Sequence, residues 1–207
     1  MHNQMLNKTI RTLLLPLLAA LLLAACGSSS NPDGVTQGPG ISGVVFVQQG
    51  PVAGATVVLK TSEGQLLGST ITNSNGAYFV PTTESGPYVA KATSPSGSVW
   101  YCISDNERMV ISHLSDFMLR RFAAALTQSS IDSIFNQLSP STPVPDQASL
   151  DDAANKIFAA TLVSLNLDSL NLFGDEVSGS LEKVLRATTI VGTALEVHMN
   201  EPRLDMR

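Results

Sequence analysis

Histidine is the first side chain to consider for chemistry, because its imidazole binds metals and transfers protons near neutral pH. After residue 25 the sequence contains His113 and His198, and Glu201 follows His198 with an H-x-x-E spacing that could supply two zinc ligands. A catalytic zinc site needs a third protein ligand, and His113 lies far upstream of the pair. Ser115 or Asp116, just after His113, suits the N-cap of a helix, so this segment is better explained by helix capping than by metal binding. We therefore expect no metal and no cofactor.

Paired carboxyl groups, which general acid–base catalysis uses, occur at Asp151-Asp152 and Asp175-Glu176. Both pairs fit helix starts, where negative charge meets the positive end of the helix dipole. The segment 73–76 has the shape of a calcium loop, but its asparagines bring no charge, so a simple turn is expected. The sequence contains no G-x-S-x-G, no P-loop and no dinucleotide-binding motif. We predict no catalytic residues and a protein that is not an enzyme.

Two adjacent aromatic residues, Trp100 and Tyr101, could offer a stacking surface for a sugar ring. As neighbours on a strand they point to opposite faces, so at most one belongs to the core. We expect Tyr101 to pack in the core. Trp100 is the candidate ligand-binding residue, with core packing as its equal alternative. Aromatic residues make up 5% of the chain, which is little for a dedicated carbohydrate-binding surface.

The N-terminal residues 1–25 have the layout of a secretory signal, with Lys8 and Arg11 before an apolar run and small residues after it. The run is about a dozen residues long, whereas a membrane-spanning helix needs roughly 20. The final Leu23-Ala24-Ala25-Cys26 resembles the lipobox of bacterial lipoproteins, which are cleaved before the cysteine and acylated on its thiol. The resemblance implies lipid attachment at Cys26, with acyl chains such as palmitate, and membrane localisation. Gly27 follows, where an aspartate tends to retain such proteins at the inner membrane, so the outer membrane is favoured.

Residues 26–40 are rich in Gly, Ser and Pro without a hydrophobic period, which predicts a flexible tether. The signal takes two of the 12 basic residues and none of the 17 acidic ones, so residues 26–207 have 10 basic and 17 acidic residues and a formal charge of −7. Because nucleic-acid-binding domains need a basic surface, this charge argues against nucleic acid as a partner. Once Cys26 carries lipid, Cys102 has no disulfide partner, and its apolar neighbours predict burial.

From residue 41 the pattern changes to short β-branched runs between turn residues, which is typical of an antiparallel sandwich. We expect the last two runs to form a hairpin around Asp105-Asn106. The predicted strands are 41–48, 55–60, 66–72, 77–80, 88–93, 98–103 and 108–111.

The turn glycines and core positions of residues 41 to about 95 resemble the carboxypeptidase regulatory-like domain. The resemblance lies in Ile41-Ser42-Gly43-Val44-Val45, Gly50 through Val57, Thr72 through Tyr78, and Gly86-Pro87-Tyr88. It implies a prealbumin-like (transthyretin-like) sandwich, a fold often classed with carbohydrate-binding-like folds. Such motifs specify a fold and leave the function open.

After residue 111 the period becomes helical. Ser115 or Asp116 is expected to cap a helix that runs to Leu126, and residues 130–138 predict a shorter helix. A capping-box-like start at Ser149 predicts a helix to about Leu165. Another short helix is expected at 180–187. The β-branched residues 188–191 and the alternation at 195–199 then predict strands, with one continuous helix over 180–199 as the competing interpretation.

These patterns together predict an α+β fold, with a prealbumin-like antiparallel β-sandwich over 41–112 followed by a helical region over 113–207. The possible C-terminal β-hairpin stays open against the helix. We expect a non-catalytic, lipid-anchored cell-envelope protein that binds or assembles with a protein partner. The alternative is a carbohydrate-binding surface lipoprotein. A protein-binding module should expose a contiguous apolar patch on its helices, whereas a glycan binder should expose Trp100 beside polar side chains.

Overall fold

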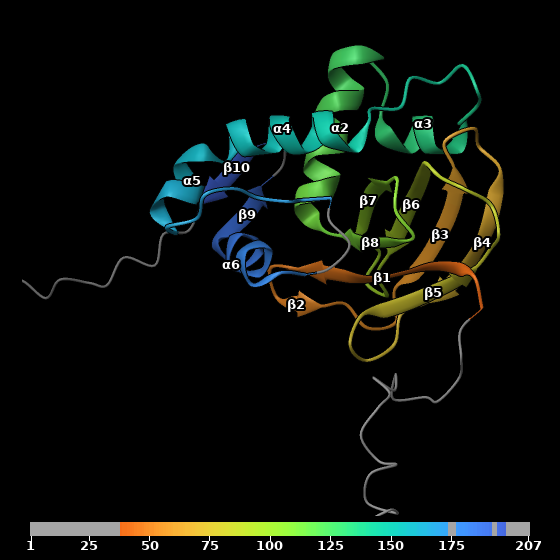
Figure 1. The fold of residues 1–207 in the computed structure, drawn as a ribbon, viewed down its shortest axis with the longest axis horizontal. Coiled ribbons are helices and arrows are strands. Elements are labelled where there is room, and N and C mark those ends of the chain that lie inside the picture. The colour runs from red at the N-terminus through yellow and green to blue at the C-terminus, as the bar shows by residue number, and fades with distance from the viewer. Residues whose placement is uncertain (1–37, 174–176, 192–193, 198–207) are drawn as a thin grey trace, which may run out of the picture. The chain divides into compact units, whose positions relative to one another are not determined.

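The first half of the chain forms the short strands that the alternating apolar residues predict (Figure 1). The computed structural model describes residues 38–173, 177–191 and 194–197. The predicted strands are confirmed to within two residues at their ends, and a further short strand, β2, pairs with the end of β1. The strands of this half are β1 (Gly40–Val47), β2 (Gly50–Pro51), β3 (Thr56–Thr61), β4 (Leu66–Ile71), β5 (Ala77–Pro81), β6 (Tyr88–Thr93), β7 (Val99–Ser104) and β8 (Arg108–Ile111).

These strands pair into two sheets. One sheet has the order β2-β1-β5 with β8 also beside β1, and the other has the order β4-β3-β6-β7. Each pair is antiparallel except β1 with β8, which is parallel and places Ser42 opposite Arg108 and Val45 opposite Ile111. Antiparallel sheets accompanied by a few helices make this an α+β fold that is compatible with a sandwich, as predicted.

The hairpin expected around Asp105-Asn106 is wrong. β7 pairs with β6, whereas β8 crosses to the other sheet and pairs with β1. Cys102 in β7 lies with its Sγ 3.3 Å from the carbonyl oxygen of Val110 in β8, so the two strands face each other across the core. Alternation alone reports which residues are buried and leaves the pairing partner open.

Both faces of the β4-β3-β6-β7 sheet are covered near β6 and β7. Ala90 and Cys102 lie opposite each other on the face that looks towards β8, and both are fully buried. Val89 and Ile103 lie opposite each other on the other face and are buried as well. The helix α2 (His113–Leu126) contacts β7 on that second face, so the sheet is an inner layer between the second sheet and the helices (Figure 1).

Two helices, α2 and α4, begin at caps that the sequence places differently. Ser112, rather than Ser115 or Asp116, is the N-cap of α2, and Ser115 completes a capping box with it. The helix predicted from Ser149 to about Leu165 begins earlier, after the N-cap Asp146, and is divided at Phe158. The remaining helices are α3 (Ile131–Asn136), α4 (Gln147–Ile157), α5 (Ala159–Ser164) and α6 (Gly179–Ala187).

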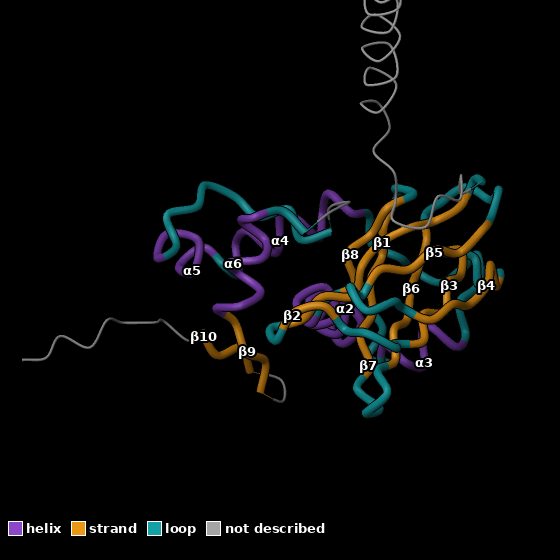
Figure 2. The backbone as a smooth tube through the Cα atoms, turned by 90° about the horizontal axis from the view of Figure 1, so that it is seen from below, coloured by secondary structure: helices purple, strands orange, loops and turns teal. Residues whose placement is uncertain are grey.

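The end of the described chain forms a separate two-stranded sheet, β9 (Thr188–Val191) with β10 (Ala194–Val197). Thr188 lies opposite Val197, which confirms the strand prediction over the competing continuous helix. Figure 2 shows this pair away from the two larger sheets. Among the described helices, none has the length and apolar character that crossing a membrane requires.

Candidate functional site

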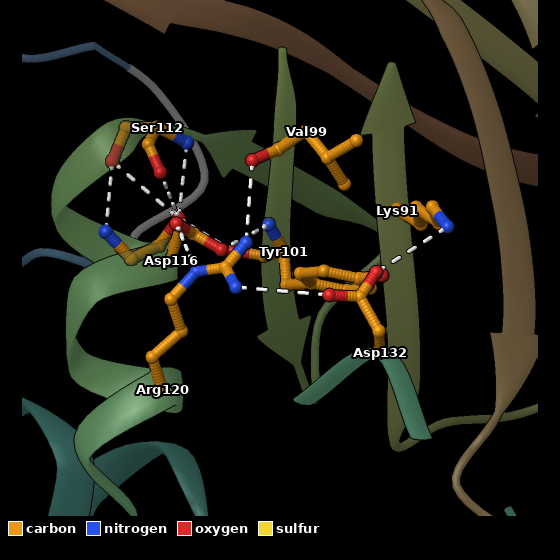
Figure 3. A network of polar contacts seen from close by, with 8 residues as sticks. Lys91, Val99, Tyr101, Ser112, Asp116, Arg120 and Asp132 are labelled. Carbon is orange, nitrogen blue, oxygen red and sulfur yellow. Dashed lines mark hydrogen bonds and ion pairs between the residues drawn. The ribbon is translucent and has the colours of Figure 1, made fainter. Parts of the chain in front are cut away.

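A cluster of charged side chains joins the β4-β3-β6-β7 sheet, on the face that α2 contacts, to α2 and α3 (Figure 3). Its members are Lys91 in β6, Tyr101 in β7, Asp116 and Arg120 in α2, and Asp132 in α3. We call these five residues the charged cluster. Helical spacing places Asp116 and Arg120 one turn apart, and strand pairing places Lys91 directly opposite Tyr101.

Each charge of the cluster has an opposite charge beside it. The Arg120 Nε donates to Asp116 Oδ2 at 2.7 Å, and Arg120 Nη1 lies 3.7 Å from Asp132 Oδ2. Lys91 Nζ lies 3.6 Å from Asp132 Oδ1. Tyr101 contributes in two ways, because its hydroxyl donates to Asp132 and its backbone N–H donates to Asp116 Oδ1 at 3.2 Å.

The protonation of the cluster follows from burial and pairing. Burial raises the pKa of the Tyr101 hydroxyl above its usual range, and the hydrogen bond to Asp132 raises it further. That hydrogen bond holds the pKa of Asp132 below its usual range. Burial raises the pKa of Asp116, and the neighbouring Arg120 opposes this shift. The charged cluster therefore holds a protonated tyrosine between a salt-bridged α2 and a salt-bridged α3, an arrangement that fixes both helices on the sheet.

The start of α2 reinforces the same contact. The Ser115 hydroxyl donates to the carbonyl oxygen of Tyr101 at 2.9 Å, and the Ser115 N–H donates to the Ser112 hydroxyl at 3.1 Å. Because Ser115 is fully buried, its hydroxyl and its backbone N–H both need such partners. The sequence shows the pair Asp116 and Arg120 at helical spacing, but it gives no signal for the contribution of the two strands and of α3.

The candidate residue Trp100 is half-buried and packs against the hydrophobic core. It lies opposite Ala92 on the face that looks towards the other sheet. Tyr101 is fully buried, as predicted, although it packs against α3 through Phe135, with ring centroids 5.5 Å apart. The structure therefore separates Trp100 from the charged cluster.

Cys102 is fully buried and His113 is half-buried. His113 Nε2 lies 3.2 Å from the carbonyl oxygen and 3.3 Å from the hydroxyl of Thr188, and its Nδ1 is buried without a partner among the described residues. Burial lowers the pKa of His113 to about 4. Burial also raises the pKa of Cys102 to about 12, so this thiol stays protonated. The candidates Cys26, His198 and Glu201 lie outside the described residues.

The first predicted acid pair, Asp151-Asp152, does not start a helix. Asp151 lies in the second turn of α4, and its Oδ1 accepts the N–H groups of Leu172 at 2.9 Å and Phe173 at 3.2 Å. Asp152 forms an exposed ion pair with Lys156 at 2.6 Å. Asp175 and Glu176 lie outside the described residues.

The Asn73 turn uses its side chain internally. The Asn73 Oδ1 accepts the N–H groups of Asn75 at 2.9 Å and Ala77 at 3.0 Å, which forms the expected turn between β4 and β5. Within the ranges that the structure describes, no three His, Cys, Asp or Glu residues are placed to hold a metal ion.

Among the described residues, large apolar side chains are exposed at two places. Ile157 in α4 is 43% exposed and Val163 in α5 is 80% exposed, with the exposed Ala160 between them at helical spacing. We call Ile157, Ala160 and Val163 the α4–α5 patch. The second place is β4, where Leu66 and Ile71 are exposed.

Comparison with known proteins gives a weak structural similarity. The chain matches no described protein family and no curated protein. Among solved structures it is similar to Klebsiella pneumoniae 5-hydroxyisourate hydrolase, with 17% identity, coverage of 36% of this chain and 90% of the hydrolase chain, and a TM-score of 0.26.

This comparison contradicts the prediction that the chain is not an enzyme, because the similar protein is a hydrolase. We withdraw that prediction. The likeness is too weak to transfer the hydrolase's activity to this chain or to assign catalytic residues.

Proposed function

We propose that this chain is a lipid-anchored protein of the bacterial cell envelope, with the outer membrane favoured, whose folded part binds a protein partner. The observation that carries the proposal is Leu23-Ala24-Ala25-Cys26, which follows a short apolar run and precedes a Gly- and Ser-rich segment. Several acyl chains on Cys26, at ~0.8 kcal/mol per buried methylene, would hold the protein firmly in the bilayer.

We further propose that residues 41–112 form a prealbumin-like sandwich. Two observations support this assignment. The turn glycines of the sequence resemble those of that family, and β1, β5 and β8 lie in one sheet whereas β3, β4, β6 and β7 lie in the other. The boundary at residue 112 fits the change from β8 to α2.

The α4–α5 patch supports a protein as the partner. Val163 extends an aliphatic side chain that is 80% exposed, and Ile157 at the end of α4 and Ala160 in α5 are also exposed. An exposed aliphatic face suits the apolar surface of a protein, whereas a sugar ring is recognised by an exposed aromatic ring with polar neighbours. Trp100, the candidate for sugar stacking, is half-buried against the core.

Site-specific photo-crosslinking in intact cells tests the partner. A photoreactive residue at Val163 should give one discrete adduct larger than the chain, and the same residue at Ala148, which is exposed elsewhere on α4, should not. Ile157→Lys should reduce the adduct about fivefold or more, because a charge placed within an apolar contact is left unpaired. Equal adducts at both positions, or an adduct that Ile157→Lys leaves unchanged, would count against the α4–α5 patch as the binding surface.

A further inference from the structure

The strand β4 is the outermost strand of its sheet. Among the described strands it pairs with β3 alone, and Figures 1 and 2 both show it at the rim of the folded part. Its residues Leu66–Ile71 include no charged residue and no proline. Natural edge strands usually carry such residues, because an unprotected edge pairs with another strand.

A β-bulge places two apolar side chains of β4 on the same face of the sheet. Leu66 pairs with Lys60 and Gly68 pairs with Leu59, so Leu67 is the extra residue. In a regular strand Leu66 and Ile71, five positions apart, would point to opposite faces. Because of the bulge both point to the same face, and they are 62% and 67% exposed.

The helices leave this part of the face uncovered. Lys60 Nζ donates to the carbonyl oxygen of Phe135 at 2.8 Å, which marks how far α3 reaches over the sheet. Beyond that contact, Thr56 and Ser69 are exposed and Val58 is half-buried. This part of the outer face is therefore uncovered, and among the described strands β4 has no pairing partner other than β3.

The order of side chains along β4 is self-complementary. With Leu67 set aside as the bulged residue, Ser69 is the central position, Gly68 and Thr70 flank it on one face, and Leu66 and Ile71 lie at the two ends on the other. A twofold axis at Ser69 would place Leu66 of each copy directly opposite Ile71 of the other, since opposed residues of antiparallel strands share a face. No like charges would be opposed, because these five positions carry no charge.

We propose that β4 is a self-association edge, which pairs antiparallel with β4 of a second copy of this chain about an axis at Ser69. The pairing joins the β4-β3-β6-β7 sheets of two copies into one continuous sheet. Two contacts between Leu66 and the second copy's Ile71 cover the exposed apolar side chains. This inference rests on the fold alone and does not depend on the proposed lipid anchor.

Engineered cysteines in the full chain test this register, because a disulfide needs Cα atoms ~4.4–6.8 Å apart and directly opposed antiparallel residues fall within that range. Ser69→Cys alone should give a disulfide-linked dimer on a non-reducing gel, and so should Leu66→Cys combined with Ile71→Cys. Leu66→Cys alone, Ile71→Cys alone and Val163→Cys should not. The single variants control for the native cysteines and for random collision.

A charge exchange provides the second measurement. Leu66→Lys with Ile71→Lys should reduce the Ser69→Cys dimer about tenfold or more, because like charges become opposed across the edge. Mixing that variant with a protein that carries Leu66→Glu and Ile71→Glu should restore the dimer when both proteins also carry Ser69→Cys. Equal crosslinking of all five cysteine variants, no dimer of Ser69→Cys, or a Ser69→Cys adduct with a different protein in place of the dimer would overturn the proposal.

Discussion

Replacing Gly43 with alanine is expected to destabilise the fold by about 3 kcal/mol or more, because the new methyl group has no room. Gly43 lies in β1 between Tyr78 of β5 and Met109 of β8. A Cβ atom there would lie 2.0 Å from the carbonyl oxygen of Met109 and 2.7 Å from the Tyr78 hydroxyl oxygen. Tyr78 Oη crosses Gly43 to donate to that same carbonyl at 3.3 Å. The Met109 carbonyl belongs to the backbone and cannot rotate away as a side chain could, so β1 and β8 must separate.

Urea unfolding followed by the fluorescence of the single tryptophan measures this loss. Gly179→Ala is the matched control, since nothing lies within 4 Å of a Cβ at that position in the first turn of α6. We expect that control to change stability by less than about 1 kcal/mol and in the stabilising direction, because alanine favours helix. A Gly43→Ala protein as stable as the parent would show that the β1–β8 contact is looser than described.

Lowering the pH from 7 to 4 is expected to remove up to about 3 kcal/mol of stability through His113. Burial lowers the pKa of His113 in the folded chain to about 4, against an ordinary value of 6.5. Below pH 6.5 the unfolded chain therefore takes up a proton that the folded chain does not. The stabilisation is complete above pH 6.5 and is lost as the pH falls towards 4.

His113→Gln isolates this effect, because glutamine keeps an N–H donor for Thr188 and does not titrate. The raised pKa values of Asp116 and Asp151 act in the opposite direction, and both proteins retain them. The quantity to compare is the free energy of unfolding at pH 7 minus that at pH 4.5. We expect this difference to be about 2 kcal/mol smaller in His113→Gln than in the parent. Equal differences in the two proteins would mean that the pKa of His113 is the same in the folded and unfolded chains.

Local features of the fold could be predicted from the sequence, whereas contacts between distant elements could not. Alternation of apolar residues located β3 and β6, because one face of each strand fills the core. The parallel partner of β8 was missed, since the short β7–β8 loop also suits a hairpin. Ser112 was missed as the cap of α2 because Ser115 and Asp116 nearby are equally suitable residues.

The charged cluster was missed for a similar reason. Asp116 and Arg120 can be paired from their spacing, but Lys91 and Asp132 come from two other elements that only the folded chain brings together. The bulge at Leu67 has no sequence signal either, although it decides which side chains share the face of β4. The lipid anchor is the reverse case, since it follows from a local pattern at the N-terminal end of the sequence and stays a prediction.

The intact mass of the membrane-extracted protein, measured beside Cys26→Ser, tests the central claim most directly. We predict a mass equal to residues 26–207 plus acyl chains, and we predict that Cys26→Ser loses the acyl chains and is released from the membrane. A soluble chain whose Cys26 is unmodified would contradict the account, and the protein would then have to be considered as a secreted module.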